Sequence, residues 1–473
     1  MAALSVFDML KIGVGPSSSH TLGPWRAVQR WLQELRGEID LASISEIKVI
    51  LYGSLALTGR GHCTDKAICL ALLGHDPEHI PVDQIEPFIE ALSKNKQLSL
   101  GAGASASFDP AQDIIYQQSE RLPFHANGMQ CQAMSNGKKL ASTYYSVGGG
   151  FVVKEGEEES QDNEVKLPYP TEFPTDLQRH CEQQGFLIAD MVQANEQSWQ
   201  TKEAVSSRLL EIWQVMKEGL YRGCHTEGIL PGGLEVRRRA RSINAKLLNG
   251  EDAKDVDAWI QLIRSNTYNF RDVLKWVSCF ALAVNEENAN LGRVVTAPTN
   301  GAAGVIPAVL MYHVCFAENE VSNDEIVNFL MVAGEIGTFF KKRATISAAM
   351  GGCQAEIGVS SAMAAAALTE IQGGTVEQSL MAAEIAMEHH LGLTCDPIRG
   401  LVQIPCIERN SMGAVKAINA ATLALEGDPK EAKVSLDEVI QTMWETAKDM
   451  NSKYKETSQG GLAVNISVRV PEC

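Results

Sequence analysis

Positive charge is scarce in this sequence. Its 41 lysines and arginines face 58 aspartates and glutamates, so the formal net charge is -17. Proteins that bind a phosphate backbone need a basic surface, because each neutralised phosphate releases counterions. The one basic cluster, residues 237–241, is typical of a solvated helix face. We therefore expect no nucleic-acid partner.

Long apolar runs are also missing. The first residues, Met-Ala-Ala-Leu-Ser-Val-Phe, lack the basic start and the apolar stretch of a signal peptide. No window approaches the roughly 18 apolar residues that a membrane span requires. We therefore expect a cytoplasmic protein with no membrane partner. Because the cytoplasm is reducing, the 11 cysteines should be small buried residues or metal ligands rather than disulfides.

The sequence contains neither a Cys-x-x-Cys pair nor an evident internal repeat. The first absence disfavours a structural zinc ribbon and an electron-transfer ferredoxin, whose ligands use that spacing. The second disfavours a solenoid, which would show a period of about 20 to 50 residues. A chain of 473 residues with 45% apolar content is instead long enough for two or three domains with sizeable cores.

Short β-type runs and helical stretches alternate in the first part of the chain, and helices fill the rest. An acidic, aperiodic segment separates the two parts. We therefore predict the α+β class, with an α+β domain at residues 1–155, an acidic linker at 156–172 and an all-α domain at 173–473. The clearest expected strands are 47–52 and 142–153, and the clearest expected helices are 24–35, 64–73, 203–216, 271–284, 324–340, 360–371 and 412–425.

Three cysteines, Cys353, Cys395 and Cys406, lie in glycine- and proline-rich segments, where we expect irregular backbone rather than helix. Ligands of a metal cluster need such backbone, because glycine permits the required dihedrals and leaves N–H groups free for the sulfides. Spacing alone leaves two interpretations open, an iron–sulfur site or three inert thiols. A 4Fe-4S cluster with three cysteine ligands would leave one iron open to act as a Lewis acid.

Residues 11–24 (Lys-Ile-Gly-Val-Gly-Pro-Ser-Ser-Ser-His-Thr-Leu-Gly-Pro) combine a glycine turn, serines and a histidine at an expected helix start. The match to a dinucleotide loop is weak, because a serine takes the place of the third glycine and no strong strand precedes it. Backbone N–H groups with Ser17 and Ser19 would suit a small carboxylate equally well, and His20 is a candidate catalytic residue.

Three further segments carry candidate residues. His62 follows a glycine turn and precedes Thr64 and Asp65, so it is either a general base within a catalytic group or a histidine at a helix cap. Residues 299–301 form either a substrate-binding turn or an ordinary helix cap. Lys341 lies at the end of a predicted helix. Its positive charge either interacts favourably with the helix dipole or binds a substrate carboxylate. The residues of the turn are Thr299, Asn300 and Gly301.

The motifs at residues 15–21, 59–65, 297–304 and 351–353 occur in an order that resembles the bacterial single-chain iron–sulfur L-serine dehydratases along nearly the whole chain. The resemblance implies L-serine as substrate, a homodimer, and an all-α catalytic domain joined to a domain similar to the allosteric substrate-binding domain of some phosphoglycerate dehydrogenases. It also implies a 4Fe-4S cluster on Cys353, Cys395 and Cys406. His62 would then take the α-proton, while His20 or a neighbouring serine would hold the substrate.

The chain end, residues 460–473, is apolar and is expected to be extended. Its last residue, Cys473, carries a thiol and a carboxylate on the skeleton of serine, so it could bind the open iron until serine displaces it. The alternative is a disordered tail.

Two other functions stay open at this point. A pyridoxal-phosphate serine dehydratase would use residues 297–304 as its phosphate loop, although it would leave the three loop cysteines unexplained. A serine-sensing regulatory protein would use the N-terminal domain as a binding module. Cofactor absorbance distinguishes the pyridoxal-phosphate enzyme from an iron–sulfur enzyme. Turnover of serine distinguishes an enzyme from a serine-sensing regulatory protein.

Overall fold

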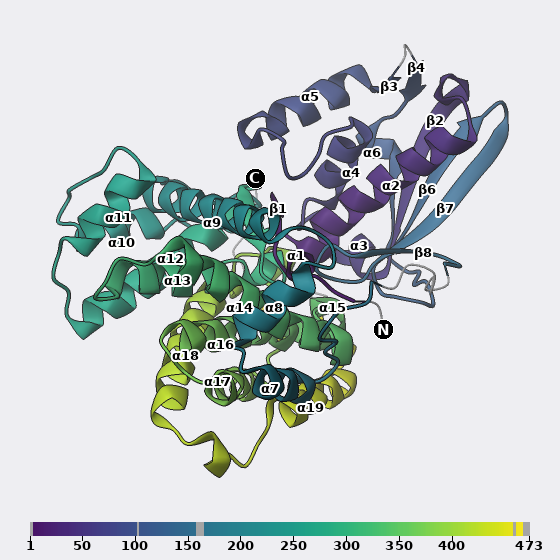
Figure 1. Cartoon of the computed structure of the whole chain (residues 1–473). Coiled ribbons are helices and arrows are strands. Elements are labelled where there is room, and N and C mark those ends of the chain that lie inside the picture. Colours follow the sequence, from purple (N-terminus) through teal and green to yellow (C-terminus); the bar gives the residue numbers. More distant parts are fainter. Residues whose placement is uncertain (1–2, 102–103, 158–164, 457–459, 467–473) are drawn as a thin grey trace.

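The computed structural model describes residues 3–101, 104–157, 165–456 and 460–466 (Figure 1). The middle of the predicted acidic linker, residues 158–164, and the terminal Cys473 lie outside the described residues. A strand-bearing part occupies the first third of the chain and a helical part the remainder, as the α+β class predicts. No described helix is long and apolar enough to span a membrane.

A seven-stranded mixed sheet organises the N-terminal part, in the order β3-β4-β2-β6-β7-β8 with β5 also pairing with β2. Alternate residues of β2 are buried, which is the pattern of a strand with one face on a core. That face packs beneath α2 and α4 (Figure 1). The strands are β2 (Ile44–Tyr52), β3 (Gln97–Gly101), β4 (Ala104–Ser107), β5 (Ile114–Gln117), β6 (Gly128–Ser135), β7 (Lys138–Ser146) and β8 (Val152–Lys154).

The prediction of a single strand at residues 142–153 is wrong. Two strands, β7 and β8, pair antiparallel there, and a turn joins them. The turn contains Gly148, Gly149 and Gly150, all with positive φ. Glycine populates these dihedrals without a steric penalty, so the run of apolar residues conceals a reversal of the chain.

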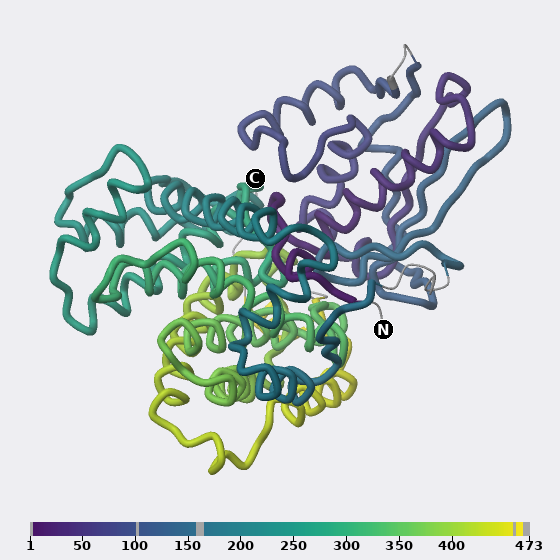
Figure 2. Tube along the Cα trace, viewed as in Figure 1, coloured from purple at the N-terminus to yellow at the C-terminus, as the bar shows by residue number. Residues whose placement is uncertain are grey.

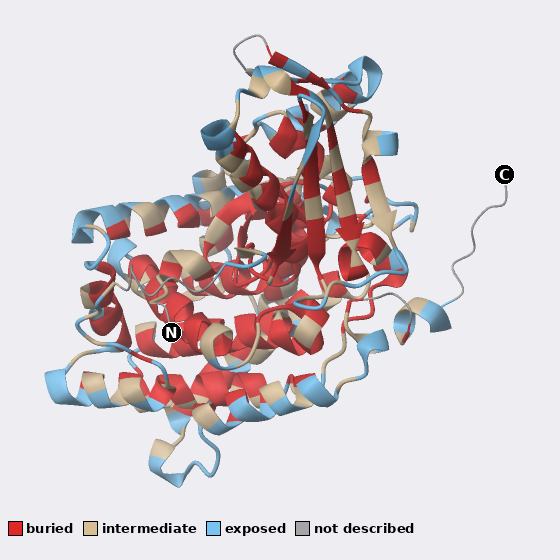
Figure 3. Ribbon diagram, turned by 90° about the vertical axis from the view of Figure 1, so that its right-hand side faces the viewer, coloured by how far each residue is buried: buried red, intermediate tan, exposed pale blue. Residues whose placement is uncertain are grey.

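The helical part is built around α16, which is buried along nearly its whole length. Four consecutive alanines, residues 364–367, have no exposed surface. Because alanine side chains are small, α14, α17 and α18 pack closely around this helix. Figure 3 shows the resulting concentration of buried residues in the central helices.

A short strand lies within the part predicted to be all-α. This strand, β9 (Arg293–Thr296), pairs antiparallel with β1 (Lys11–Val14). The sequence predicts no strong strand before the glycine turn at residues 13–15, and β1 shows that this expectation is wrong. Apolar residues 6–12 belong to the core of the helical part, and Figure 2 shows this N-terminal segment running between the sheet and the helices. The pairing places the segment that follows β1 beside the helical part.

Helix positions agree with the sequence, but most helices are longer than expected. The structure extends α18 back to Cys406, so this cysteine begins a helix instead of lying outside one. The N-terminal part contains α1 (Val6–Met9), α2 (Gly23–Glu38), α3 (Gly53–Thr58), α4 (Thr64–Leu72), α5 (Ile85–Asn95) and α6 (Pro110–Asp113). The helical part contains α7 (Pro174–Gln184), α8 (Ile188–Glu196), α9 (Lys202–His225), α10 (Ala240–Leu247), α11 (Val256–Arg264), α12 (Phe270–Asn288), α13 (Val305–Phe316), α14 (Asn323–Arg343), α15 (Ala348–Gly351), α16 (Ile357–Ile371), α17 (Val376–Glu388), α18 (Cys406–Glu426), α19 (Leu436–Asp449) and α20 (Leu462–Asn465).

Candidate functional site

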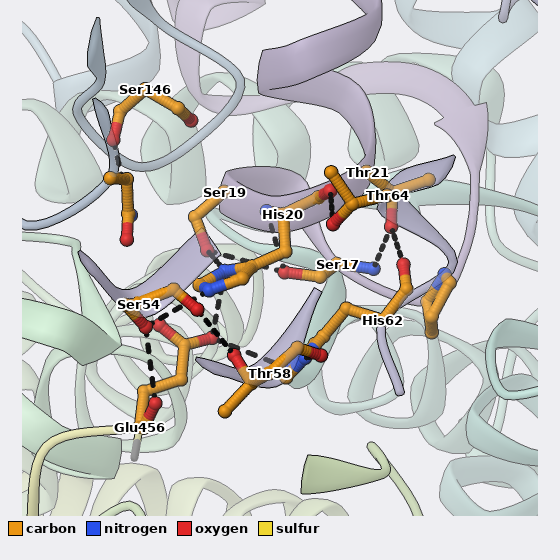
Figure 4. A network of polar contacts seen from close by, with 12 residues as sticks. Ser17, Ser19, His20, Thr21, Ser54, Thr58, His62, Thr64, Ser146 and Glu456 are labelled. Carbon is orange, nitrogen blue, oxygen red and sulfur yellow. Dashed lines mark hydrogen bonds and ion pairs between the residues drawn. The ribbon is translucent and has the colours of Figure 1, made fainter. Parts of the chain in front are cut away.

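Two histidines and one glutamate meet where the two parts of the chain join (Figure 4). Nδ1 of His20 lies 3.5 Å from Oε1 of Glu456, and Nε2 of His62 lies 3.6 Å from the same oxygen. The two imidazole rings stack with their centroids 4.5 Å apart. All three residues are buried. We call this group the His20–His62–Glu456 network.

Serine hydroxyls fix the position of His20. A π-helical turn (Ser18–Leu22) carries the histidine, and the Ser17 hydroxyl caps this turn by accepting a hydrogen bond from the His20 N–H at 3.1 Å. The Ser19 hydroxyl lies 2.9 Å from Nδ1 of His20, and the Ser54 hydroxyl lies 3.0 Å from Nε2. Both predicted serines therefore lie at the network, in contact with His20 or its backbone.

A backbone carbonyl fixes the tautomer of His62. Nδ1 of His62 lies 2.9 Å from the carbonyl oxygen of Thr58. Because a carbonyl only accepts hydrogen bonds, Nδ1 carries the proton and Nε2 is left as a proton acceptor. Burial lowers the pKa of His62 to about 4, against the opposing effect of the Thr58 hydrogen bond, so the ring is neutral at neutral pH.

Two threonine hydroxyls tie the segments of the histidines together. The Thr21 hydroxyl donates to the carbonyl of His62 at 2.7 Å, and the Thr64 hydroxyl donates to the carbonyl of His20 at 2.6 Å. Thr64 thus positions backbone and does not reach the imidazoles. Asp65 accepts from the N–H of Lys66, and no hydrogen bond or ion pair among the described residues joins it to either histidine.

The three predicted cysteines are buried in the helical part. Cys353 lies in a 3-10 turn (Gly352–Ala355), Cys395 precedes a proline-containing loop, and Cys406 begins α18. The reactive atoms of Cys353, Glu356 and Cys395 lie within 4.8 Å of one another, which makes them a candidate metal-binding group. Each buried thiol sits on or beside irregular backbone, as ligands of a cluster require.

A guanidinium group stabilises one of these sulfurs as a thiolate. Nη1 of Arg409 lies 3.1 Å from Sγ of Cys353 and also donates to the carbonyl of Thr394 at 2.6 Å. The hydrogen bond from Cys395 and the charge of Arg409 lower the pKa of Cys353 to about 6, although burial opposes them. The pKa values of Cys395 and Cys406 are raised, the first by its hydrogen bond to Cys353 and the second by burial.

Glu456 links the cysteines to the histidines. The N–H of Cys395 donates to the carbonyl of Tyr454 at 2.8 Å, and the N–H of Glu456 donates to the carbonyl of Cys395 at 2.8 Å. This two-bond bridge holds the carboxyl group of Glu456 between the cysteine loop and the imidazoles. Burial raises the pKa of Glu456, and the nearby Glu356 and Cys353 raise it further.

Sequence reasoning missed Glu456. It lies in a charged segment, residues 453–456, that is typical of a solvated surface. Only the structure shows its left-handed φ of 54°. A residue other than glycine rarely adopts this conformation, which is concentrated at functional sites.

The turn at residues 299–301 borders the cysteine group. Asn300 donates through Nδ2 to the carbonyl of Val14 at 3.0 Å, which ties the turn to β1. A Cβ on Gly301 would lie 2.8 Å from a carboxylate oxygen of Glu356, so glycine permits the close approach. Thr299 is buried beside Glu356, where burial raises the pKa of the carboxyl group to about 8 and the Thr299 hydroxyl opposes that rise.

Lys341, a candidate for the substrate carboxylate, has no hydrogen bond or ion pair with the His20–His62–Glu456 network in the described part of the chain. Nζ of Lys341 lies 4.5 Å from the ring centroid of Phe151. The predicted site residues therefore divide into the network, the cysteine group with its bordering turn, and two outlying residues, Asp65 and Lys341.

The chain matches two family models that together cover most of its length. Residues 5–157 match the serine dehydratase beta chain, and residues 183–463 match the serine dehydratase alpha chain. The chain is 47% identical over 469 residues to an L-serine dehydratase of Streptomyces coelicolor, covering 98% of this chain and 99% of the relative. It is 46% identical over 465 residues to L-serine dehydratase 2 of Escherichia coli, with the same coverage of both chains. A Haemophilus influenzae L-serine dehydratase is 46% identical over 472 residues, again with coverage of 98% and 99%.

Proposed function

Because the chain belongs to the serine dehydratase family, with the beta and alpha chains joined in one polypeptide, we propose that it is a lyase that converts L-serine to pyruvate and ammonia. One observation carries the proposal. A buried carboxyl group lies 3.5 and 3.6 Å from two imidazoles, while its own backbone bonds to the cysteine loop. Acid–base groups and a candidate metal site thus share one location.

The residues present suit a 4Fe-4S cluster. Cys353, Cys395 and Cys406 offer buried sulfurs, and the Arg409 guanidinium favours the thiolate form that binds metal. Such a cluster, when bound by three cysteines, would supply an open iron that acts as a Lewis acid on the hydroxyl group of the substrate. These cysteines also favour an iron–sulfur enzyme over a pyridoxal-phosphate enzyme, which would not use them.

His62 is the proposed base for the α-proton of serine. Its neutral ring, with Nε2 unprotonated, can accept the α-proton of serine. His20, fixed by Ser19 and Ser54, would hold the substrate. Loss of the α-proton and of the β-hydroxyl as water gives 2-aminoacrylate, which hydrolyses to pyruvate and ammonia.

The remaining predicted residues have supporting roles. Thr64 fixes the backbone of His20, and Ser17 caps the turn that carries it. The turn Thr299, Asn300 and Gly301 would form the wall of the substrate site beside Glu356. Asp65 would act on the site only through its place at the start of α4. We also propose a cytoplasmic homodimer with the domain boundaries predicted from the sequence.

Cofactor absorbance tests the iron–sulfur assignment. Anaerobically purified protein should show broad brown absorbance that oxygen bleaches. A yellow band that pyridoxal phosphate restores, without bound iron, would instead identify the pyridoxal-phosphate alternative.

The Glu456→Ala variant should lower kcat by about 10- to 100-fold, with a smaller change in KM, because removal of a group that orients a functional histidine has effects of this order. The substitution leaves both imidazoles without their shared partner. Steady-state kinetics under anaerobic conditions measures the two constants. Glu445→Ala, at an exposed position of α19, is the matched control and should behave as wild type. Equal kcat values for the two variants would exclude a role for Glu456.

Deletion of Cys473 should leave a cluster that still turns over serine but loses iron faster in air. Cys473 lies outside the described residues, and the short helix α20 interrupts the extended tail that the sequence predicts. We propose that the terminal thiol protects the open iron when serine is absent. Visible spectra followed in air measure the loss. Identical spectra and identical lifetimes for the deleted and intact proteins would contradict this role.

A further inference from the structure

Three basic side chains from both parts of the chain gather around Phe151. Nζ of Lys11 lies 3.5 Å from the ring centroid, and Nζ of Lys341 lies 4.5 Å from it. The guanidinium group of Arg26 lies beside Gly150, the residue before Phe151: its Nη1 would be 3.6 Å from a Cβ placed on that glycine. Lys11 belongs to β1, Arg26 to α2 and Lys341 to the last turn of α14. We call this group the Lys11–Arg26–Lys341 cluster.

Few acidic groups pair directly with this cluster among the described residues. Asp8 forms an ion pair with Lys11 at 3.8 Å. Neither Arg26 nor Lys341 has a hydrogen bond or an ion pair with any described residue. Glu78, Asp76 and Asp8 act on Arg26 electrostatically, and Asp8 also acts on Lys341, but Glu78 is already paired with Arg208 and Asp8 with Lys11. Partly buried cations that lack partners are costly, because desolvation is not repaid by an opposite charge.

The pKa values of the lysines reflect this cost. Burial and the neighbouring charge of Arg26 lower the pKa of Lys11 to about 7, although Asp8 opposes them. Burial also lowers the pKa of Lys341 to about 8. An anion between these groups would favour their charged forms.

A glycine turn adds backbone donors. Gly148, Gly149 and Gly150 are buried, and the carbonyl of Gly149 accepts a hydrogen bond from Nζ of Lys11 at 3.3 Å. The N–H groups of Gly149 and Gly150 donate to no acceptor within the described ranges. Consecutive free N–H groups in such a turn form a concavity that binds anions.

We propose that the Lys11–Arg26–Lys341 cluster and the glycine turn form a binding site for the carboxylate of a small organic acid, separate from the His20–His62–Glu456 network. The Phe151 ring, over which both ammonium groups lie, brings apolar carbon next to the site, and only an anion with a carbon skeleton would use it. The proposal does not depend on the turnover of serine.

Calorimetric titration of the full-length protein with pyruvate, at constant ionic strength and without oxygen, tests the site. Pyruvate should bind saturably, and Arg26→Gln and Lys341→Gln should each weaken binding by at least about tenfold, as loss of a desolvated charged partner does. Lys342→Gln, on the same turn of α14, is the matched control and should bind as wild type. Lys341→Arg, which keeps the charge, should retain binding and so shows that the position tolerates substitution.

Three outcomes would overturn the proposal. The first is the absence of saturable pyruvate binding to the wild type. The second is wild-type affinity in both Arg26→Gln and Lys341→Gln, which would place the bound pyruvate elsewhere. The third is binding of inorganic phosphate without binding of pyruvate, which would show an oxyanion site of a different class.

Discussion

Replacement of Cys353, Cys395 or Cys406 by serine should abolish the iron absorbance and the turnover of serine together. Each thiol is buried in the helical part, and the candidate ligand that lies beside Cys353 and Cys395 is a carboxylate, Glu356, not a further sulfur. A hydroxyl binds iron of a cluster far less well than a thiolate, because soft thiolate ligands suit these clusters. Iron analysis, visible spectra and pyruvate formation, all measured anaerobically, should fall in parallel in each variant.

The matched control is Cys315→Ala, a substitution at another buried cysteine. Cys315 lies in α13, and burial raises the pKa of its thiol against the smaller opposing effect of the Arg264 charge. We expect full iron content and a loss of about 1 kcal/mol in the free energy of unfolding. A fully occupied cluster in any one of the three serine variants would remove that cysteine from the site.

The His62→Ala variant, with its iron content intact, should lower kcat by about 10²- to 10⁴-fold, the range that general acid–base catalysis contributes. Nε2 of His62 is the unprotonated nitrogen, and burial keeps the ring neutral at neutral pH. Its loss leaves no proton acceptor at that position, whereas the cysteine group is untouched. Anaerobic steady-state kinetics with cluster content measured in the same sample checks the prediction.

His389→Ala serves as the control for this variant. His389 is exposed beyond the end of α17, and its Nδ1 lies 2.7 Å from a backbone carbonyl of its own helix. Its removal should not change kcat. A His62→Ala enzyme with nearly wild-type kcat would show that another group takes the α-proton.

Local sequence patterns predicted the separate pieces of the site. The serine and histidine motif at residues 17–20 and the segment before α4 both carry residues of the network, and the three cysteines are buried near one another or near Arg409. Glycine, serine and proline around polar residues are local signals, so they are visible without a structure. The helices were also predictable in position, because their apolar periodicity extends over several turns.

Long-range pairing could not be predicted. The pairing of β1 with β9 joins residues far apart in the chain, and each strand has only four residues. Glu456 reaches the histidines because Tyr454 and Glu456 bond to the backbone of Cys395 and because the Ser54 hydroxyl donates to the Glu456 carbonyl. Asp65 is close to His62 in sequence, but it lies in the first turn of α4 and accepts a hydrogen bond from the N–H of Lys66 instead.

Conversion of L-serine to pyruvate by anaerobically purified, iron-reconstituted protein is the most direct test of the central claim. We expect pyruvate and ammonia to form in equal amounts, at a rate proportional to bound iron, and we expect the activity to disappear when a chelator removes the iron. Activity that is independent of iron, activity that requires pyridoxal phosphate, or no pyruvate from fully iron-loaded protein would contradict the account.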